Sequence, residues 1–126
     1  MPSGIASKIR HVLPKNILAK LPQEIGVVLI NTHTTQKLNQ IYRGKNKTTN
    51  VLSFFYNYEY GEILICPEIV KKEAKKQGNS QEYQMTWMVL HGMLHLAGVH
   101  HEQSRVQARR FFELEKKILI KFFKKI

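Results

Sequence analysis

Short apolar runs mark the first half of the chain, and longer amphipathic stretches mark the second half. Three runs rich in β-branched and aromatic residues have the length of strands, at 24–31, 51–56 and 62–66. Three later stretches repeat their apolar residues at helical spacing, at 67–77, 81–97 and 102–123. Strands that come early and helices that come late predict an α+β fold, a small mixed β-sheet covered by helices. The length fits one domain over 1–126.

Residues that favour helix ends frame these later helices. Pro67 is a good first helical residue, and Gly78 predicts the end of the helix that it begins. Ser80 is the predicted N-cap of the next helix, and Gly98 is its predicted stop. In a left-handed conformation Gly98 would also turn the chain back after this long helix.

The first 44 residues carry a weaker pattern. A short amphipathic helix is predicted before Pro22, with three apolar residues, Ile17, Leu18 and Leu21. For residues 4–13, an additional strand of the sheet stays an open alternative. A further helix, capped by Thr32 or Thr34, is predicted to end at Gly44. Its buried stripe is expected to consist of Leu38, Ile41 and Tyr42.

The charge of the chain is strongly positive. Lysine and arginine number 20 against 9 acidic residues, which gives a formal net charge of +11. Such a balance favours a polyanionic partner such as RNA, DNA or an anionic lipid surface, although a lysine-rich proteome accounts for it equally well. All nine acids are glutamates, so no mechanism for this chain can use an aspartate.

The single cysteine excludes a disulfide framework and fits a reducing cytosol. Because Cys66 ends the apolar run 63–66, we expect a packed core thiol and not a nucleophile. No apolar run approaches the roughly 20 residues of a membrane span. Residues 1–20 also lack the apolar stretch of a signal peptide, so we expect a cytoplasmic protein with no membrane partner.

Four of the six histidines fall within the eleven residues 91–101. His91 and His95 are four apart, so a helix presents both rings on one face, where they can reach one ion at about 2.0–2.1 Å. A turn at Gly98 would return His101 to the open side of that ion. Three nitrogen ligands leave a fourth position for water, as in catalytic zinc sites. His100 stays open as a fourth ligand, which would make the site closed and structural.

This histidine spacing is that of the metzincin metalloproteases. In those enzymes a glutamate follows the first histidine and acts as general base, whereas Gly92 occupies that position here. Peptide hydrolysis is therefore disfavoured.

The same residues resemble the YbeY family of rRNA maturation factors, which are zinc-dependent single-strand endoribonucleases. The family signature His-Gly-x-Leu-His-Leu-x-Gly-x-Asp-His stands at 91–101 as HGMLHLAGVHH. Two further family segments are an arginine before a polar loop and a Val-Leu-Ser-Phe strand, and a Gly-Asp-Ile triplet. They stand here as Arg43 with TNVLSF at 49–54, and as GEI at 61–63. Order and spacing agree over roughly 25–118.

The resemblance implies hydrolysis of RNA phosphodiester bonds. Its expected context is rRNA maturation at the 3′ end of 16S rRNA and ribosome quality control, with the small ribosomal subunit as partner. It implies one zinc ion held by His91, His95 and His101, with His91 and Arg43 as catalytic residues. Arg43 would add charge-assisted hydrogen bonds to the phosphate. The residues alone favour a solvated loop cation at this position.

Two positions depart from the family, since His100 and Glu62 stand where it has aspartates. An orienting or proton-accepting role of the first aspartate would pass to His100 or be lost. Three alternate tyrosines can stack bases or form ordinary sheet surface: Tyr56, Tyr58 and Tyr60. Two other functions stay open: a metal hydrolase of small phosphoesters or amides, and a non-catalytic ribosome-associated zinc protein.

Overall fold

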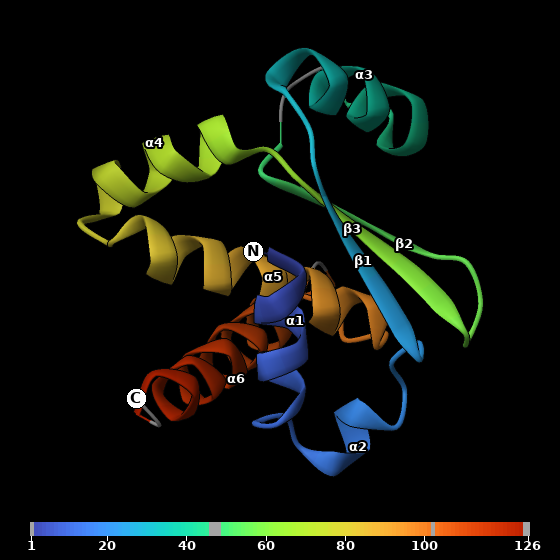
Figure 1. Cartoon of the computed structure of the whole chain (residues 1–126), viewed down its shortest axis with the longest axis vertical. Coiled ribbons are helices and arrows are strands. Elements are labelled where there is room, and N and C mark those ends of the chain that lie inside the picture. Colours follow the sequence, from blue (N-terminus) through green and yellow to red (C-terminus); the bar gives the residue numbers. More distant parts are fainter. Residues whose placement is uncertain (1, 46–48, 102, 125–126) are drawn as a thin grey trace.

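The computed structural model describes residues 2–45, 49–101 and 103–124 (Figure 1). The elements in chain order are α1 (Pro2–Arg10), α2 (Lys15–Leu18), β1 (Glu24–Leu29), α3 (Thr32–Arg43), β2 (Val51–Phe55), β3 (Tyr60–Ile65), α4 (Pro67–Gln77), α5 (Gln81–Leu96) and α6 (Arg105–Lys124). The α+β prediction is confirmed, and most bounds differ from the predicted ones by only one to three residues.

The three described strands form one mixed sheet in the order β1-β3-β2. β1 runs parallel to β3, with Val27 opposite Ile63, and β2 runs antiparallel to β3, with Ser53 opposite the same residue. Ile63 therefore lies at the centre of the sheet, and it is fully buried. Cys66, directly after β3, is also fully buried, as predicted for a core thiol.

The long helix α5 is the centre of the fold. It contacts β2 and β3 on one side and packs against α1, α4 and α6 on its others (Figure 1). Nine of its 16 residues are buried, and Leu90, Met93 and Leu94 have no exposed surface. A helix that is apolar almost all round must be enclosed, which explains why elements pack on several sides of α5. Ser80 caps its start, as predicted, by accepting a hydrogen bond from Tyr83 N at 3.0 Å.

The possible strand at 4–13 is wrong, because most of this segment is the helix α1. Three apolar residues of the segment are nearly fully buried and lie three apart, at Ala6, Ile9 and Val12. This spacing places them along one side of a helix, which packs on α5 and β1. The sheet therefore keeps its α5 side covered and gains no strand from the N-terminus.

Helix α3 lies where it was predicted, but its N-cap and its buried residues differ from the predicted ones. The N-cap is Asn31, whose Oδ1 accepts a hydrogen bond from Thr34 N at 2.8 Å. The buried residues of the helix are the polar Thr35 and Asn39, whereas Ile41 and Tyr42 expose 61% and 64% of their surface. The reason is that α3 meets the loop before β2, where the Thr35 hydroxyl donates a hydrogen bond to the Thr49 carbonyl.

Candidate metal centre

Two turns of α5 and the segment after it bring three histidines together. His91 and His95 lie on the last part of the helix, on the same side. Gly98 then has a φ of 80°, in the left-handed region where only glycine is unstrained, and Val99 N bonds back to Leu94 O. The turn directs His101 back toward the helix, as the sequence predicted.

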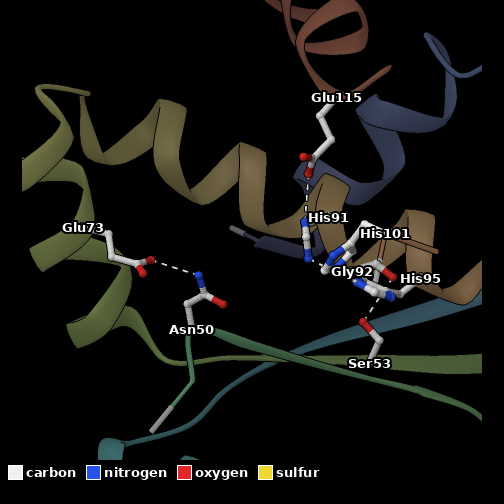
Figure 2. Close-up of polar contacts among 8 residues, drawn as sticks. All are labelled: Asn50, Ser53, Glu73, His91, Gly92, His95, His101 and Glu115. Carbon is white, nitrogen blue, oxygen red and sulfur yellow. Dashed lines mark hydrogen bonds and ion pairs between the residues drawn. The ribbon is translucent and has the colours of Figure 1, made fainter. Parts of the chain in front are cut away.

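The three ring nitrogens converge on one point (Figure 2). His95 Nε2 is 3.2 Å from His91 Nε2 and 3.1 Å from His101 Nε2, and all the ligand atoms lie within 4.8 Å of one another. A tetrahedral ion with metal–nitrogen bonds of 2.0–2.1 Å separates its ligand nitrogens by about 3.3–3.4 Å. The donor set therefore fits a single metal ion. His100 is exposed and is not part of this cluster.

A buried glutamate holds the first histidine in place. Glu115 of α6 is only 3% exposed, and its Oε2 lies 2.9 Å from His91 Nδ1. When Nδ1 carries the hydrogen of this bond, Nε2 keeps its lone pair for the cluster. Glu115 is not among the residues predicted from the sequence. The sequence feature that marks it is the presence of one acidic residue on the apolar helix face that contains Phe111 and Ile118.

An aromatic ring closes one side of the cluster. The Phe111 ring centroid lies 5.1 Å from that of His91, 5.6 Å from His95 and 4.8 Å from His101. Phe111 is itself only 3% exposed. One apolar ring against three imidazoles excludes water on that side, so a ligand must approach from the opposite one.

Gly92 allows α5 to lie very close to the sheet. A Cβ at this position would be 2.8 Å from Ile63 Cγ2 and 3.0 Å from Ser53 Oγ. Ser53 Oγ donates a hydrogen bond to the Gly92 carbonyl at 3.1 Å, which ties β2 to the helix (Figure 2). A side chain at position 92, a catalytic carboxylate included, would have to displace Ile63 or Ser53.

The open side of the cluster is a pocket of about 440 Å³. Its lining contains the three histidines, Tyr42, Arg43 and the segment 49–54. The structure thus brings Arg43, a predicted site residue, to the same pocket as the histidines. Its side chain leaves the last turn of α3 and is exposed. As far as the structure describes the chain, no carboxylate lines this pocket; Glu102 lies outside the described residues.

Comparison with known proteins identifies the family. Residues 3–123 match the family described as Endoribonuclease YbeY. The chain belongs to this family. An Endoribonuclease YbeY of Thermotoga maritima is 36% identical over 121 residues, covering 90% of this chain and 81% of the relative. An Endoribonuclease YbeY of Bdellovibrio bacteriovorus is 37% identical over 95 residues, covering 74% of this chain and 63% of the relative.

The fold is shared as well. The solution structure of a Thermotoga maritima protein aligns with a TM-score of 0.62 at 29% identity, covering 98% of this chain and 84% of that one. The resemblance to YbeY proteins read from the histidine signature is therefore confirmed.

The YbeY segment at 49–54 forms the pocket wall opposite the histidines. The buried Thr35 donates a hydrogen bond to the Thr49 carbonyl at 3.0 Å, and Asn50 Nδ2 donates to Glu73 Oε1 at 2.9 Å (Figure 2). Cys66 N also bonds to the Asn50 carbonyl. The start of β2, beside the histidine cluster, is thus tied by hydrogen bonds to α3, to α4 and to the residue after β3.

The two departures from the YbeY pattern lie at different places. His100 is exposed, and it is neither part of the histidine cluster nor among the residues that line the pocket. The orienting contact to a histidine comes instead from Glu115. Glu62 lies on β3 and accepts hydrogen bonds from Tyr56 and Tyr60, away from the three histidines.

Proposed function

We propose that this chain is a zinc-dependent endoribonuclease that cleaves single-stranded RNA, and that residues 1–126 form its one catalytic domain. The observation that carries the proposal is the cluster of three imidazole nitrogens that opens into the pocket with Arg43. The relatives named Endoribonuclease YbeY support RNA as the substrate. The formal charge of +11 agrees with a phosphate-rich ligand.

In this proposal Arg43 binds the phosphate at the cleavage site. Its guanidinium lies at the rim of the pocket, where charge-assisted hydrogen bonds can form with phosphoryl oxygens. These bonds strengthen as negative charge builds up on the phosphate during attack. Thr49 and Asn50 keep the facing wall in place, so the phosphate is held between a fixed strand and the histidines.

His91, His95 and His101 are the proposed metal ligands, and nitrogen donors of this number and spacing favour zinc. A bound zinc ion would supply Lewis-acid chemistry toward a phosphoryl oxygen and would lower the pKa of a coordinated water. Glu115 keeps His91 in the tautomer whose Nε2 faces the cluster. Phe111 excludes water from behind the rings, which strengthens electrostatic interactions within the site.

The proposed biological role is rRNA maturation at the 3′ end of 16S rRNA, together with ribosome quality control. The proposed partner is then the small ribosomal subunit, and the proposed location is the cytoplasm. Among the described residues, no helix has both the length and the apolar character needed to cross a bilayer.

The test combines metal content with cleavage. We expect purified protein to hold about one zinc per chain and to cleave a labelled single-stranded RNA, with both properties lost in His95→Ala. His100→Ala is the matched control, because it removes an exposed histidine outside the cluster and should keep both properties.

Three results would overturn the proposal. The first is cleavage that survives in His95→Ala or in metal-free protein. The second is a preference for small phosphoesters over RNA at matched concentration. The third is zinc that is present and bound by three histidines without any cleavage of single-stranded RNA, which would favour a structural ion.

A further inference from the structure

A row of aromatic rings begins at the rim of the metal pocket and continues along β2 and β3. Tyr42 meets Phe54 edge-on with ring centroids 5.1 Å apart. Phe54 then stacks on Tyr56 at 6.5 Å with 22° between the planes, and Tyr56 stacks on Tyr60 at 5.9 Å and 11°. These spacings are those of favourable aromatic pairs. We call these four residues the aromatic row.

The row lies on the side of the sheet that faces away from α5. In the β2–β3 pairing Ser53 faces α5, since it bonds to Gly92, so its neighbour Phe54 faces the other way. Phe54 is paired with Glu62, which therefore shares its face. Tyr42 and Tyr56 expose 64% and 59% of their surface, so the rings are open to a ligand.

Glu62 fixes the far end of the row. Tyr60 Oη donates a hydrogen bond to Glu62 Oε2 at 2.7 Å, and Tyr56 Oη donates to Oε1 at 3.1 Å. These bonds raise the pKa of both tyrosines above its usual value, so their hydroxyls stay protonated. Tyr60 lies across β1, where a Cβ at Gly26 would come within 2.5 Å of its hydroxyl oxygen. Tyr56 and Tyr60 are therefore held nearly parallel to each other before any ligand arrives.

We propose that the aromatic row stacks the bases of single-stranded RNA on one side of the phosphate that Arg43 holds. The proposal rests on the proposed RNA substrate and names a base-binding surface for it. Its main support is continuity, because Tyr42 and Phe54 line the same pocket as Arg43 and the three histidines. An RNA strand that leaves the pocket around the β2 edge, onto the face of the sheet away from α5, meets Tyr56 and then Tyr60.

Charge decides which part of the RNA contacts the row. The chain as a whole attracts phosphates through its formal charge of +11. The carboxylate of Glu62 at the far end of the row repels them locally, so the bases and not the backbone face this surface. Stacking on aromatic side chains tolerates any base, which suits an enzyme that holds single strands without reading their sequence.

The test measures RNA affinity apart from cleavage. Metal-free protein, prepared with a chelator, is titrated into a short labelled single-stranded RNA and followed by fluorescence anisotropy at several salt concentrations. Tyr56→Leu keeps an apolar side chain of similar size but removes the flat ring. We expect it to weaken binding roughly 5- to 150-fold, the range measured for loss of one stacked base.

Two control variants separate the ring from its surroundings. Tyr56→Phe keeps the ring and should bind within about twofold of the original protein. Tyr58→Leu changes a more exposed tyrosine outside the row, one that contacts Phe55 instead, and should also bind normally. Because stacking releases no counterions, Tyr56→Leu should leave the salt slope unchanged, whereas Arg43→Ala should reduce it by about 0.7.

The outcomes separate this inference from the proposed function. If the protein cleaves RNA while Tyr56→Leu binds it normally, the aromatic row is refuted and the endoribonuclease proposal stands. A loss of affinity shared equally by Tyr58→Leu also refutes it. A change in self-association without a change in RNA affinity would assign the row to a protein interface. Absence of any RNA binding by the original protein overturns both proposals.

Discussion

Replacing Glu115 by glutamine should weaken metal binding while leaving the fold intact. Glu115 is 3% exposed, and its carboxylate Oε2 lies 2.9 Å from Nδ1 of the candidate ligand His91. Glutamine keeps the size of the side chain and one acceptor oxygen but removes the negative charge. His91 then keeps its orientation and becomes a poorer donor to a cation.

The expected loss of zinc affinity is about 10- to 100-fold, the usual effect of removing a partner that orients a metal-binding histidine. This factor corresponds to about 1.4–2.7 kcal/mol. Glu115→Leu should lose more, because the His91 Nδ1–H would then face an apolar group in a buried place. The thermal midpoint of the metal-free protein should fall little in Glu115→Gln, because the amide oxygen still accepts the His91 Nδ1–H bond. It should fall further in Glu115→Leu, which leaves that N–H without an acceptor.

The measurement is a competition titration, in which metal-free protein and a chelator of known affinity share a limiting amount of zinc. Glu113→Gln is the matched control, since it makes the same charge change on an exposed residue of the same helix. Equal affinities for Glu115→Gln and Glu113→Gln would refute the reasoning. That result would mean that long-range charge, and not the contact to His91, sets the affinity.

Three further predictions concern other parts of the structure. Arg43→Ala should lower RNA cleavage by roughly 10²–10³ with a change in stability below about 0.5 kcal/mol, checked by cleavage rate and thermal midpoint; normal cleavage, or a collapsed midpoint, would contradict it. Gly92→Ala should destabilise the metal-free protein by about 1–3 kcal/mol in urea unfolding, because its Cβ would overlap the sheet; an unchanged midpoint contradicts this. Tyr56 and Tyr60 have a raised pKa, mainly through their hydrogen bonds to Glu62. The two hydrogen bonds to Glu62 therefore contribute their full share of the folding free energy below the ordinary tyrosine pKa near 10. This contribution is lost as the pH rises through the raised pKa of the folded protein. Glu62→Gln should move the phenolate absorbance transition to lower pH. An unchanged transition would show that Glu62 does not raise the pKa of these tyrosines.

The metal ligands were predictable because their signal is local. His91, His95 and His101 lie within eleven residues, and one helix and one glycine turn decide where they point. Arg43 was selected through the family segment that follows it, and the structure brings it to the same pocket. The catalytic roles assigned to Arg43 and His91 stay predictions.

Glu115 and the buried face of α3 were missed for a common physical reason. Each depends on which distant element packs against a helix, and periodicity within the helix does not contain that information. The apolar pattern marked Ile41 and Tyr42 as buried, yet α3 meets a polar loop at the end of the sheet and buries Thr35 instead. For 4–13 the spacing did contain the answer, since apolar residues three apart lie on one side of a helix but on alternating faces of a strand.

The position of β2 at the edge of the described sheet has a consequence for solubility. Residues 48–58 carry no charge and are rich in aromatic and β-branched side chains, and Phe55 exposes 46% of its surface. An uncharged, β-prone segment at a sheet edge is a template for pairing with another chain. Electrostatic repulsion between copies with a charge of +11 opposes this pairing, and salt screens the repulsion. Concentrated protein should therefore aggregate more readily as ionic strength rises, and a lysine introduced at Phe55 should delay the onset.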